Sequence, residues 1–176
     1  MQLELIKVGN GNKKYPGNFT KKEKQIIDSN ILENEISINL FSGESIIGGT
    51  RVDYKCSNAN INMDVFEFLD KMHFESVGTV IIDAPYNQKF ADKYQKLNNT
   101  EKQFIIFANS KKTTELFNLV KEKLNPVVII IKSWNYYVPK GYCDIGSYLC
   151  YAGGYRKPTI LMICSKVNKK MDAFLV

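Results

Sequence analysis

Two apolar runs constrain the fold of this chain more than any other feature. Residues 77–82 and 127–131 carry apolar side chains on both faces of the expected strand. A strand with one face in water would instead alternate apolar and polar residues, whereas a strand buried on both faces is typical of the middle of a parallel sheet. We therefore expect an α/β fold in which these two segments are central strands.

The rest of the chain supplies further strands and the helices to cover them. Strand patterns occur at residues 3–8, 36–41, 50–55 and 60–64, and a final pair is expected at 145–151 and 159–164. One helix starts after Thr20, because Glu23 completes a capping box with it. Others are expected at residues 65–72 and 104–124, the second with a break where Ser110 caps its later part. Residues 86–101 are polar and indicate a loop with some helix. Strands that alternate with helices and end in a hairpin predict a mostly parallel sheet with an antiparallel C-terminal strand.

Length and composition exclude several classes of protein. At 176 residues the chain fits one domain, residues 1–176, without a separate recognition module. It shows no signal-peptide pattern and no apolar run of membrane-spanning length, so we expect a cytoplasmic protein that does not bind a membrane. The four cysteines have no metal-site spacing and His73 is the one histidine, which argues against a metal site and against a Ser-His-Asp hydrolase.

The charge balance leaves two interpretations open. The chain has 24 Lys and Arg against 18 Asp and Glu, a net charge of +6, and its lysines are partly clustered. Such an excess is compatible with a polyanionic partner such as a nucleic acid. Scattered lysines are equally typical of an ordinary solvated surface, so charge alone does not decide the partner.

Acidic and glycine-containing segments follow several of the expected strands. Gly43 comes directly after the strand at 36–41, where its backbone can approach a ligand closely. Asp53 ends the next strand, at a position suited to ribose hydroxyls, and Asp64 ends the third, at a position suited to an adenine amine. Asp83 ends the central strand at 77–83, and Pro85 follows it. Because ligands of open α/β sheets bind outside the carboxyl ends of the strands, we expect these residues to meet in one site.

These segments resemble the amino-methylating group of S-adenosylmethionine-dependent methyltransferases, which modify adenine N6 or cytosine N4. Phe41-Ser42-Gly43 matches the family's F-x-G loop, and Asp83-Ala84-Pro85-Tyr86 matches its D-P-P-Y signature. The order and spacing agree over residues 36–164. The sequence departs from the family where Ala84 replaces the first proline and where Ser45 replaces a second glycine. It also departs in the spacing from Gly43 to Asp53, which is too short for the usual crossover helix.

The resemblance implies a Rossmann-like methyltransferase fold, S-adenosylmethionine as cofactor and no metal. It implies that the cofactor is bound by seven residues: Phe41, Ser42, Gly43, Ser45, Asp53, Asp64 and Val65. It further implies that a nucleobase amine is methylated at the tetrapeptide Asp83, Ala84, Pro85 and Tyr86. The Asp83 carboxylate and a main-chain carbonyl would accept the amine hydrogens, which favours the localised lone pair that attacks, and Tyr86 would stack on the base. A plain turn at the end of a strand is the alternative interpretation of this tetrapeptide.

Aromatic and basic residues after the strand at 127–132 suit the nucleic-acid substrate. Base stacking and phosphate contacts are expected from five residues: Lys132, Trp134, Tyr136, Arg156 and Lys157. Trp134 and the tyrosines beside it could equally pack over the core. The expected substrate is DNA first and RNA second. Because the chain shows no target-recognition module, three alternatives are open: a homodimer, a recognition subunit, or action with little sequence preference. A methyltransferase-fold subunit that binds nucleic acid without turnover is the competing hypothesis.

Overall fold

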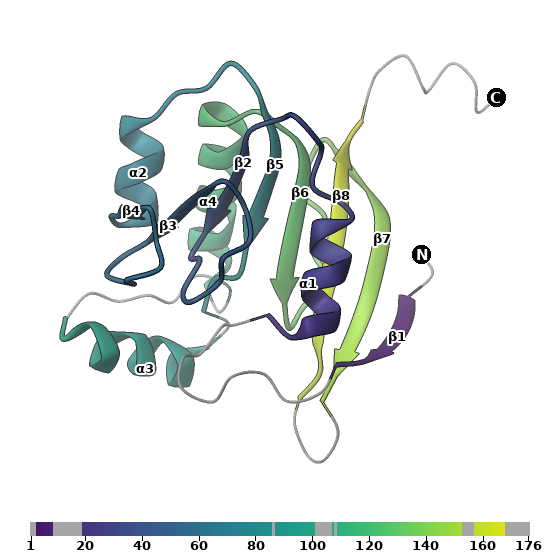
Figure 1. Ribbon diagram of the computed structural model, residues 1–176, viewed down its shortest axis with the longest axis horizontal. Helices are drawn as coiled ribbons and strands as arrows, with labels where there is room; N and C mark the ends of the chain where they lie inside the picture. Colours follow the sequence, from purple (N-terminus) through teal and green to yellow (C-terminus); the bar gives the residue numbers. More distant parts are fainter. Residues whose placement is uncertain are drawn as a thin grey trace.

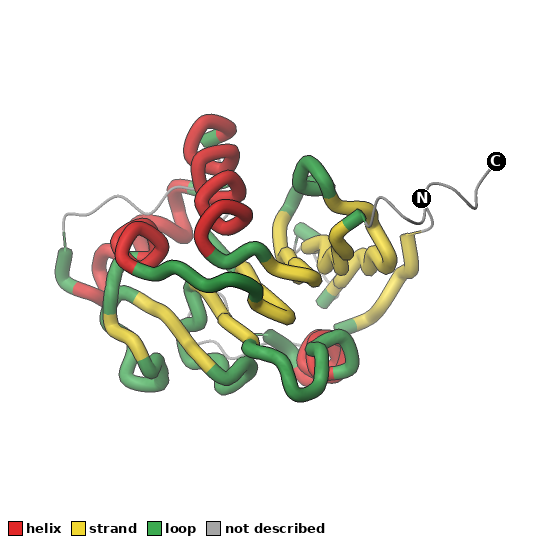
Figure 2. Tube along the Cα trace, turned by 90° about the horizontal axis from the view of Figure 1, so that it is seen from above, coloured by secondary structure: helices red, strands yellow, loops and turns green. Residues whose placement is uncertain are grey.

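The computed structural model describes residues 3–8, 19–85, 87–100, 107, 109–152 and 157–167. They form a twisted sheet of eight strands with helices on both faces (Figures 1 and 2). The strands are β1 (Leu3–Lys7), β2 (Ser37–Leu40), β3 (Thr50–Asp53), β4 (Ile61–Asn62), β5 (Val77–Ile82), β6 (Pro126–Ser133), β7 (Tyr142–Tyr151) and β8 (Thr159–Lys166). The helices are α1 (Lys21–Asp28), α2 (Val65–Lys71), α3 (Gln88–Asn98) and α4 (Ser110–Lys123).

The strand order across the sheet is β1-β7-β8-β6-β5-β2-β3-β4. Among the described strands, β8 is the one that runs antiparallel to its neighbours β6 and β7, while the other pairs are parallel. The segment β4-β3-β2-β5-β6 has the order of a doubly wound sheet, with its switch point between β2 and β5. The expected α/β, Rossmann-like fold with an antiparallel C-terminal hairpin strand is therefore confirmed.

The two apolar runs form the centre of this sheet, as expected. All six residues of β5 are buried, and so is most of β6. Alternate residues face opposite sides: Ile82 and Ile131 pack against α2 and α4, whereas Ile81 and Ile130 pack against α1. Each Ile or Leu buried in this way contributes on the order of 1.5–3 kcal/mol. The double-sided burial is what holds the strand ends in place beneath the site.

The connection from β2 to β3 contains no helix, in agreement with the short spacing in the sequence. Residues 41–49 make a tight turn, and the two strands it joins still pair in parallel. Ile47 folds back from this turn and is buried against the α1 face of the sheet, beside Ile81. One inserted side chain thus covers part of the face that a crossover helix would cover.

One expected helix and one expected loop segment differ from the structure. Helix α4 begins at Ser110 and its N-cap is Asn109, whose side chain accepts a hydrogen bond from the Lys112 N–H, so Ser110 is not the cap. Residues 104–106 of the predicted helix lie outside the described residues. The segment expected to be largely loop contains α3, which Asn87 caps and Asn99 ends in a left-handed conformation.

Candidate functional site

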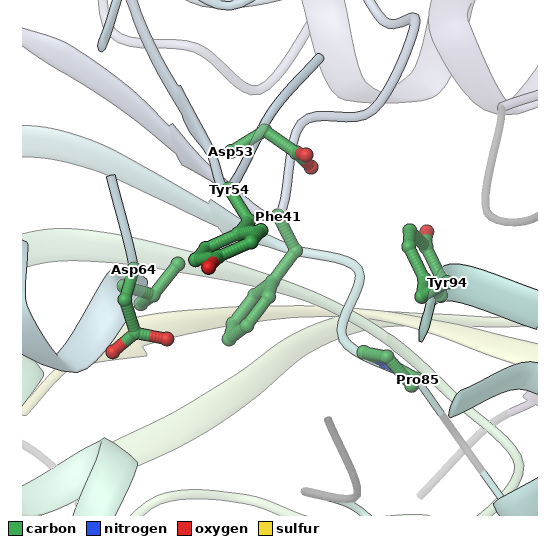
Figure 3. Close-up of a pocket in the computed structure, with 7 residues that line it drawn as sticks. Phe41, Asp53, Tyr54, Asp64, Pro85 and Tyr94 are labelled. Atoms are coloured by element: carbon green, nitrogen blue, oxygen red, sulfur yellow. The ribbon is translucent and has the colours of Figure 1, made fainter. Parts of the chain in front are cut away.

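A cleft opens at the switch point of the sheet, outside the carboxyl ends of the central strands. Its lining comes from five separate segments of the chain. Figure 3 shows the Tyr54 and Phe41 rings near the centre of the view, with Asp53 above them, Asp64 to their left, and Tyr94 and Pro85 to their right. The complete lining is Phe41, Asp53, Tyr54, Asp64, Val65, Pro85 and Tyr94.

The turn after β2 has a strained backbone. Phe41 has φ of 60° and Gly43 has φ of 52°, both in the left-handed region. A residue with a Cβ pays about 1–2 kcal/mol for this conformation, and such strain is often retained at ligand sites. The strain at Phe41 turns the chain so that its ring enters the cleft. Gly43 avoids the cost because it has no side chain.

Asp53 holds this turn from the neighbouring strand. Its Oδ2 accepts a hydrogen bond of 2.9 Å from the Gly43 N–H, and the residue is only 4% exposed. Its main-chain oxygen accepts from the Met63 N–H, which joins β3 to the segment leading into α2. A carboxylate has room for about four hydrogen bonds, so Asp53 can serve the turn and a ligand at once.

Asp64 lies at the start of α2, just after β4. Its Oδ1 accepts hydrogen bonds from the N–H groups of Phe66 and Glu67, at 3.0 and 3.2 Å. It is therefore the N-cap of the helix as well as a wall of the cleft. Val65 is buried beside it. The helix holds the Asp64 carboxylate in one orientation toward the cleft.

The other expected cofactor residues shape the turn without lining the cleft. Ser42 is buried, and its Oγ has no hydrogen-bond partner among the described residues. The Oγ of Ser45 accepts from the Ile47 N–H at 3.2 Å, and the Ser45 N–H donates to the Ser42 carbonyl. Ser42, Gly43 and Ser45 thus belong to the scaffold that carries Phe41.

The tetrapeptide after β5 lies at the same edge of the sheet. Pro85 lines the cleft, while Ala84 and Asp83 are buried, 1% and 2% exposed. The Pro85 carbonyl accepts a long hydrogen bond, 3.4 Å, from the Phe107 N–H. Tyr86 lies outside the described residues. The structure thus brings Pro85 together with four of the expected cofactor residues and buries Asp83 directly after β5. The four are Phe41, Asp53, Asp64 and Val65.

Lys132 is buried, unlike a surface residue that would contact the substrate. It is only 7% exposed at the end of β6, and its Nζ lies 3.2 Å from Oε1 of Glu23 on α1. The same Nζ lies 5.0 Å from the centre of the Phe19 ring. Burial acts to lower the pKa of Lys132, but the carboxylates of Asp83 and Glu23 outweigh it, so the pKa is raised. The substrate contact predicted for Lys132 stays a prediction, and its burial points to a role inside the site.

The remaining expected substrate residues lie beyond the end of β6. The Trp134 ring meets the Phe90 ring of α3 edge-on, with centroids 6.0 Å apart, and the Lys157 Nζ lies 4.4 Å from the Trp134 centroid. Tyr136 is exposed, and its hydroxyl donates to Asp144 at 2.8 Å, which raises the pKa of Tyr136 to about 12.

Trp134 and Lys157 thus form one aromatic and basic surface. Tyr137, the residue after Tyr136, is not part of this surface. Its ring stacks on Phe117 of α4, with centroids 4.9 Å apart, and packs against the core. Arg156 lies outside the described residues.

Comparison with known proteins leaves the chain without a matched family. No family model matches it, and no curated protein matches its sequence. Among solved structures, it is similar to Pyrococcus abyssi tRNA (uracil-54, C5)-methyltransferase in complex with S-adenosyl-L-homocysteine. The TM-score is 0.47 and the identity 11%, over 86% of this chain and 40% of that chain. The chain thus spans less than half the length of that enzyme.

Two lining residues, Tyr54 and Tyr94, were not expected from the sequence. Tyr54 directly follows Asp53, so its place after a strand could have signalled a site residue. Tyr94 lies on α3 and packs with Ala91 against Tyr54. Only the folded chain brings α3 across the strand ends (Figure 1).

Among the described residues, no cluster of three or more His, Cys, Asp and Glu side chains is arranged to hold a metal ion. The described helices include none long and apolar enough to cross a membrane.

Proposed function

We propose that this protein is a methyltransferase that moves a methyl group from S-adenosylmethionine to an exocyclic amine of a nucleobase, with adenine N6 in DNA as the first candidate. The observation that carries the proposal is the composition of the cleft. Phe41, Asp53, Asp64 and Pro85 follow four different strands, and they line one space at the switch point of a doubly wound sheet.

The chemistry of the lining fits the adenosine half of S-adenosylmethionine. The Asp53 carboxylate suits the ribose hydroxyls, and Asp64 suits the exocyclic amine of the adenine. The rings of Tyr54 and Phe41 provide apolar surfaces against which an adenine can stack. When bound, S-adenosylmethionine would supply a methyl group on a positively charged sulfur.

The chain's own residues would prepare the acceptor. The amine nitrogen must offer its lone pair to the methyl carbon while the electron pair of the carbon–sulfur bond returns to sulfur. The Asp83 carboxylate would accept a hydrogen bond from that amine, which localises the lone pair and stabilises the developing positive charge. One amine proton then leaves through Asp83 to water. Pro85 restricts Ala84 to an extended conformation, so the main-chain carbonyl at 84 keeps its orientation.

The nucleic-acid substrate is supported by the surface beside the cleft. Trp134, with Lys157 over its ring, combines an aromatic face with a positive charge, a pairing suited to single-stranded nucleic acid. The net charge of +6 adds sequence-independent attraction to phosphates. We propose that the whole chain is one methyltransferase domain, and that a second copy or a recognition subunit supplies sequence preference.

A non-catalytic nucleic-acid-binding subunit is the second candidate, because one observation favours it. The turn at residues 41–49 lacks the helix whose N-terminus would otherwise face the cofactor. A helix N-terminus stabilises nearby negative groups, so its loss weakens cofactor binding. Measurable cofactor binding without transfer would support this candidate.

The test is to incubate the purified chain with labelled S-adenosylmethionine and either DNA or RNA, and to identify the methylated nucleoside. Label in N6-methyldeoxyadenosine of DNA is expected. Label in RNA alone would identify RNA as the substrate instead of DNA. The variant Asp83→Ala should lose transfer by about 100-fold or more while it binds the cofactor normally. Asp70→Ala, at an exposed position of α2, is the matched control. Failure of the wild-type chain to bind the cofactor would overturn the proposal.

A further inference from the structure

Two charged side chains are buried together beneath the proposed acceptor site. The Nζ of Lys132 lies 3.2 and 3.3 Å from the two carboxylate oxygens of Glu23. The side chains are 8% and 1% exposed, respectively. Burial of two charges costs several kcal/mol per ion before their attraction offsets it. A pair at this position therefore calls for an explanation beyond stability.

Asp83 is the third charged member of this group. The parallel register pairs Ile81 with Ile130 and Ile82 with Ile131, and one further step brings Asp83 opposite Lys132. Side chains alternate along a strand, so Asp83 and Lys132 both lie on the α1 face, as Ile81 and Ile130 do. Neighbouring strands of a sheet lie about 4.8 Å apart. Lys132 thus lies between Asp83, which directly follows β5, and Glu23 of α1.

The first turn of α1 holds Glu23 rigidly. The Thr20 N–H donates to Oε2 of Glu23 at 2.7 Å, and the Glu23 N–H donates to the Thr20 hydroxyl at 3.4 Å. Phe19 covers the Lys132 ammonium with its ring, and among the described residues the Cys150 thiol of β7 also faces the pair. The helix cap thereby holds the Glu23 carboxylate that binds the Lys132 ammonium.

We propose that Lys132 is a positioning residue that keeps the Asp83 carboxylate ionised and oriented at the end of β5, and that Glu23 anchors it from α1. A buried carboxylate tends to bind a proton, and a protonated Asp83 could not accept a hydrogen from the amine as effectively. A neighbouring ammonium reverses that tendency. The inference deepens the proposed function and rests on it for the role of Asp83.

The variants are chosen so that Glu23 is not left as a second buried carboxylate when the ammonium is removed. Lys132→Met alone would leave two buried carboxylates together, so the informative variant is the double substitution Lys132→Met with Glu23→Gln. Glutamine at position 23 can keep the capping box. The matched control is Lys112→Met with Glu115→Gln, the same two changes in an exposed ion pair on α4.

The first measurement is the pH dependence of methyl transfer. Without the ammonium, Asp83 should hold its proton to higher pH, so the acid limb of kcat/KM should move up by about 1–3 pH units. Cofactor affinity should stay within about twofold. Glu23→Gln alone should leave the acid limb in place or move it to lower pH, because the Lys132 ammonium then interacts with the Asp83 carboxylate alone. An acid limb of the double variant that coincides with that of the wild type would overturn the inference.

The second measurement does not need catalysis. The carbon-13 signal of the Asp83 carboxyl carbon, assigned by its loss in Asp83→Asn, is followed by NMR as a function of pH. It should titrate about 1–3 pH units higher in the double variant than in the wild type, and unchanged in the α4 control. Equal midpoints would refute the role of Lys132. If the double variant does not fold, the same NMR titration of Asp83 in the Glu23→Gln variant tests the inference. A midpoint above that of the wild type would refute the role of Lys132.

The two measurements separate the two proposals. A wild-type chain that methylates neither DNA nor RNA overturns the proposed function, while the NMR titration still decides whether Lys132 controls the charge of Asp83.

Discussion

Replacement of Asp53 separates its two tasks, holding the turn and binding a ligand. In the wild type its Oδ2 accepts the buried Gly43 N–H at 2.9 Å. Asp53→Asn keeps an acceptor for that N–H but removes the negative charge. Asp53→Ala removes both and leaves a buried donor without a partner. The two variants should therefore differ in stability more than in cofactor affinity.

The structure sets the size of each effect. A buried N–H left unpaired costs about 1–3 kcal/mol, so Asp53→Ala should lower the free energy of unfolding by that amount, and Asp53→Asn by less. Loss of a hydrogen bond between a charged carboxylate and a ribose hydroxyl costs about 1.5–3 kcal/mol. That energy corresponds to roughly 10- to 100-fold weaker cofactor binding. We expect this loss in the alanine variant and a smaller one in the asparagine variant.

Isothermal titration calorimetry with S-adenosylhomocysteine, alongside urea unfolding, measures the two quantities separately. Asp70→Asn on the exposed side of α2 is the control for a general change in charge. The reasoning fails if Asp53→Ala binds S-adenosylhomocysteine as tightly as the wild type. It also fails for the turn if Asp53→Ala unfolds at the same urea concentration as Asp53→Asn.

Two further predictions concern thiol reactivity and packing. Burial raises the pKa of the Cys150 and Cys164 thiols to about 12, so at pH 8 both are almost wholly protonated and should react slowly with Ellman's reagent, while exposed Cys143 reacts first. Cys143→Ser should remove the fast phase, and a fast phase that persists would contradict this assignment. Gly78→Ala should lower the melting temperature, because the new Cβ would lie 2.3 Å from the Cβ of Glu35 and overpacking costs about 1–3 kcal/mol. An unchanged melting temperature in differential scanning calorimetry would show that the backbone there relaxes freely.

Much of the fold was predictable because its signals are local. The central strands β5 and β6 were evident from apolar runs, and the start of α1 from the capping box of Thr20 and Glu23. The absence of a crossover helix after β2 followed from the short distance between Gly43 and Asp53. Each of these depends on neighbouring residues, which the sequence states directly.

The errors arose where local signals were weak. Helix α3 is mostly polar, and its few apolar residues, Phe90, Ala91, Tyr94 and Leu97, were too sparse to indicate a helix of that length. Its stability depends on contacts with residues distant in sequence, as in the packing of Tyr94 and Ala91 against Tyr54. The assignment of the α4 cap to Ser110 instead of Asn109 was an error of one residue between two good capping side chains.

The sequence by itself determined which segments along the chain are strands and which residues follow each of them, because periodicity and turn chemistry act over a few residues. Only the tertiary structure decided which strand ends share a cleft, since this depends on the strand order across the sheet and on its switch point between β2 and β5. It also decided that Lys132 is buried. A long basic side chain usually reaches solvent. Here two carboxylates that are far apart in the chain provide negative charge around the Lys132 ammonium: Glu23 of α1 and Asp83, directly after β5.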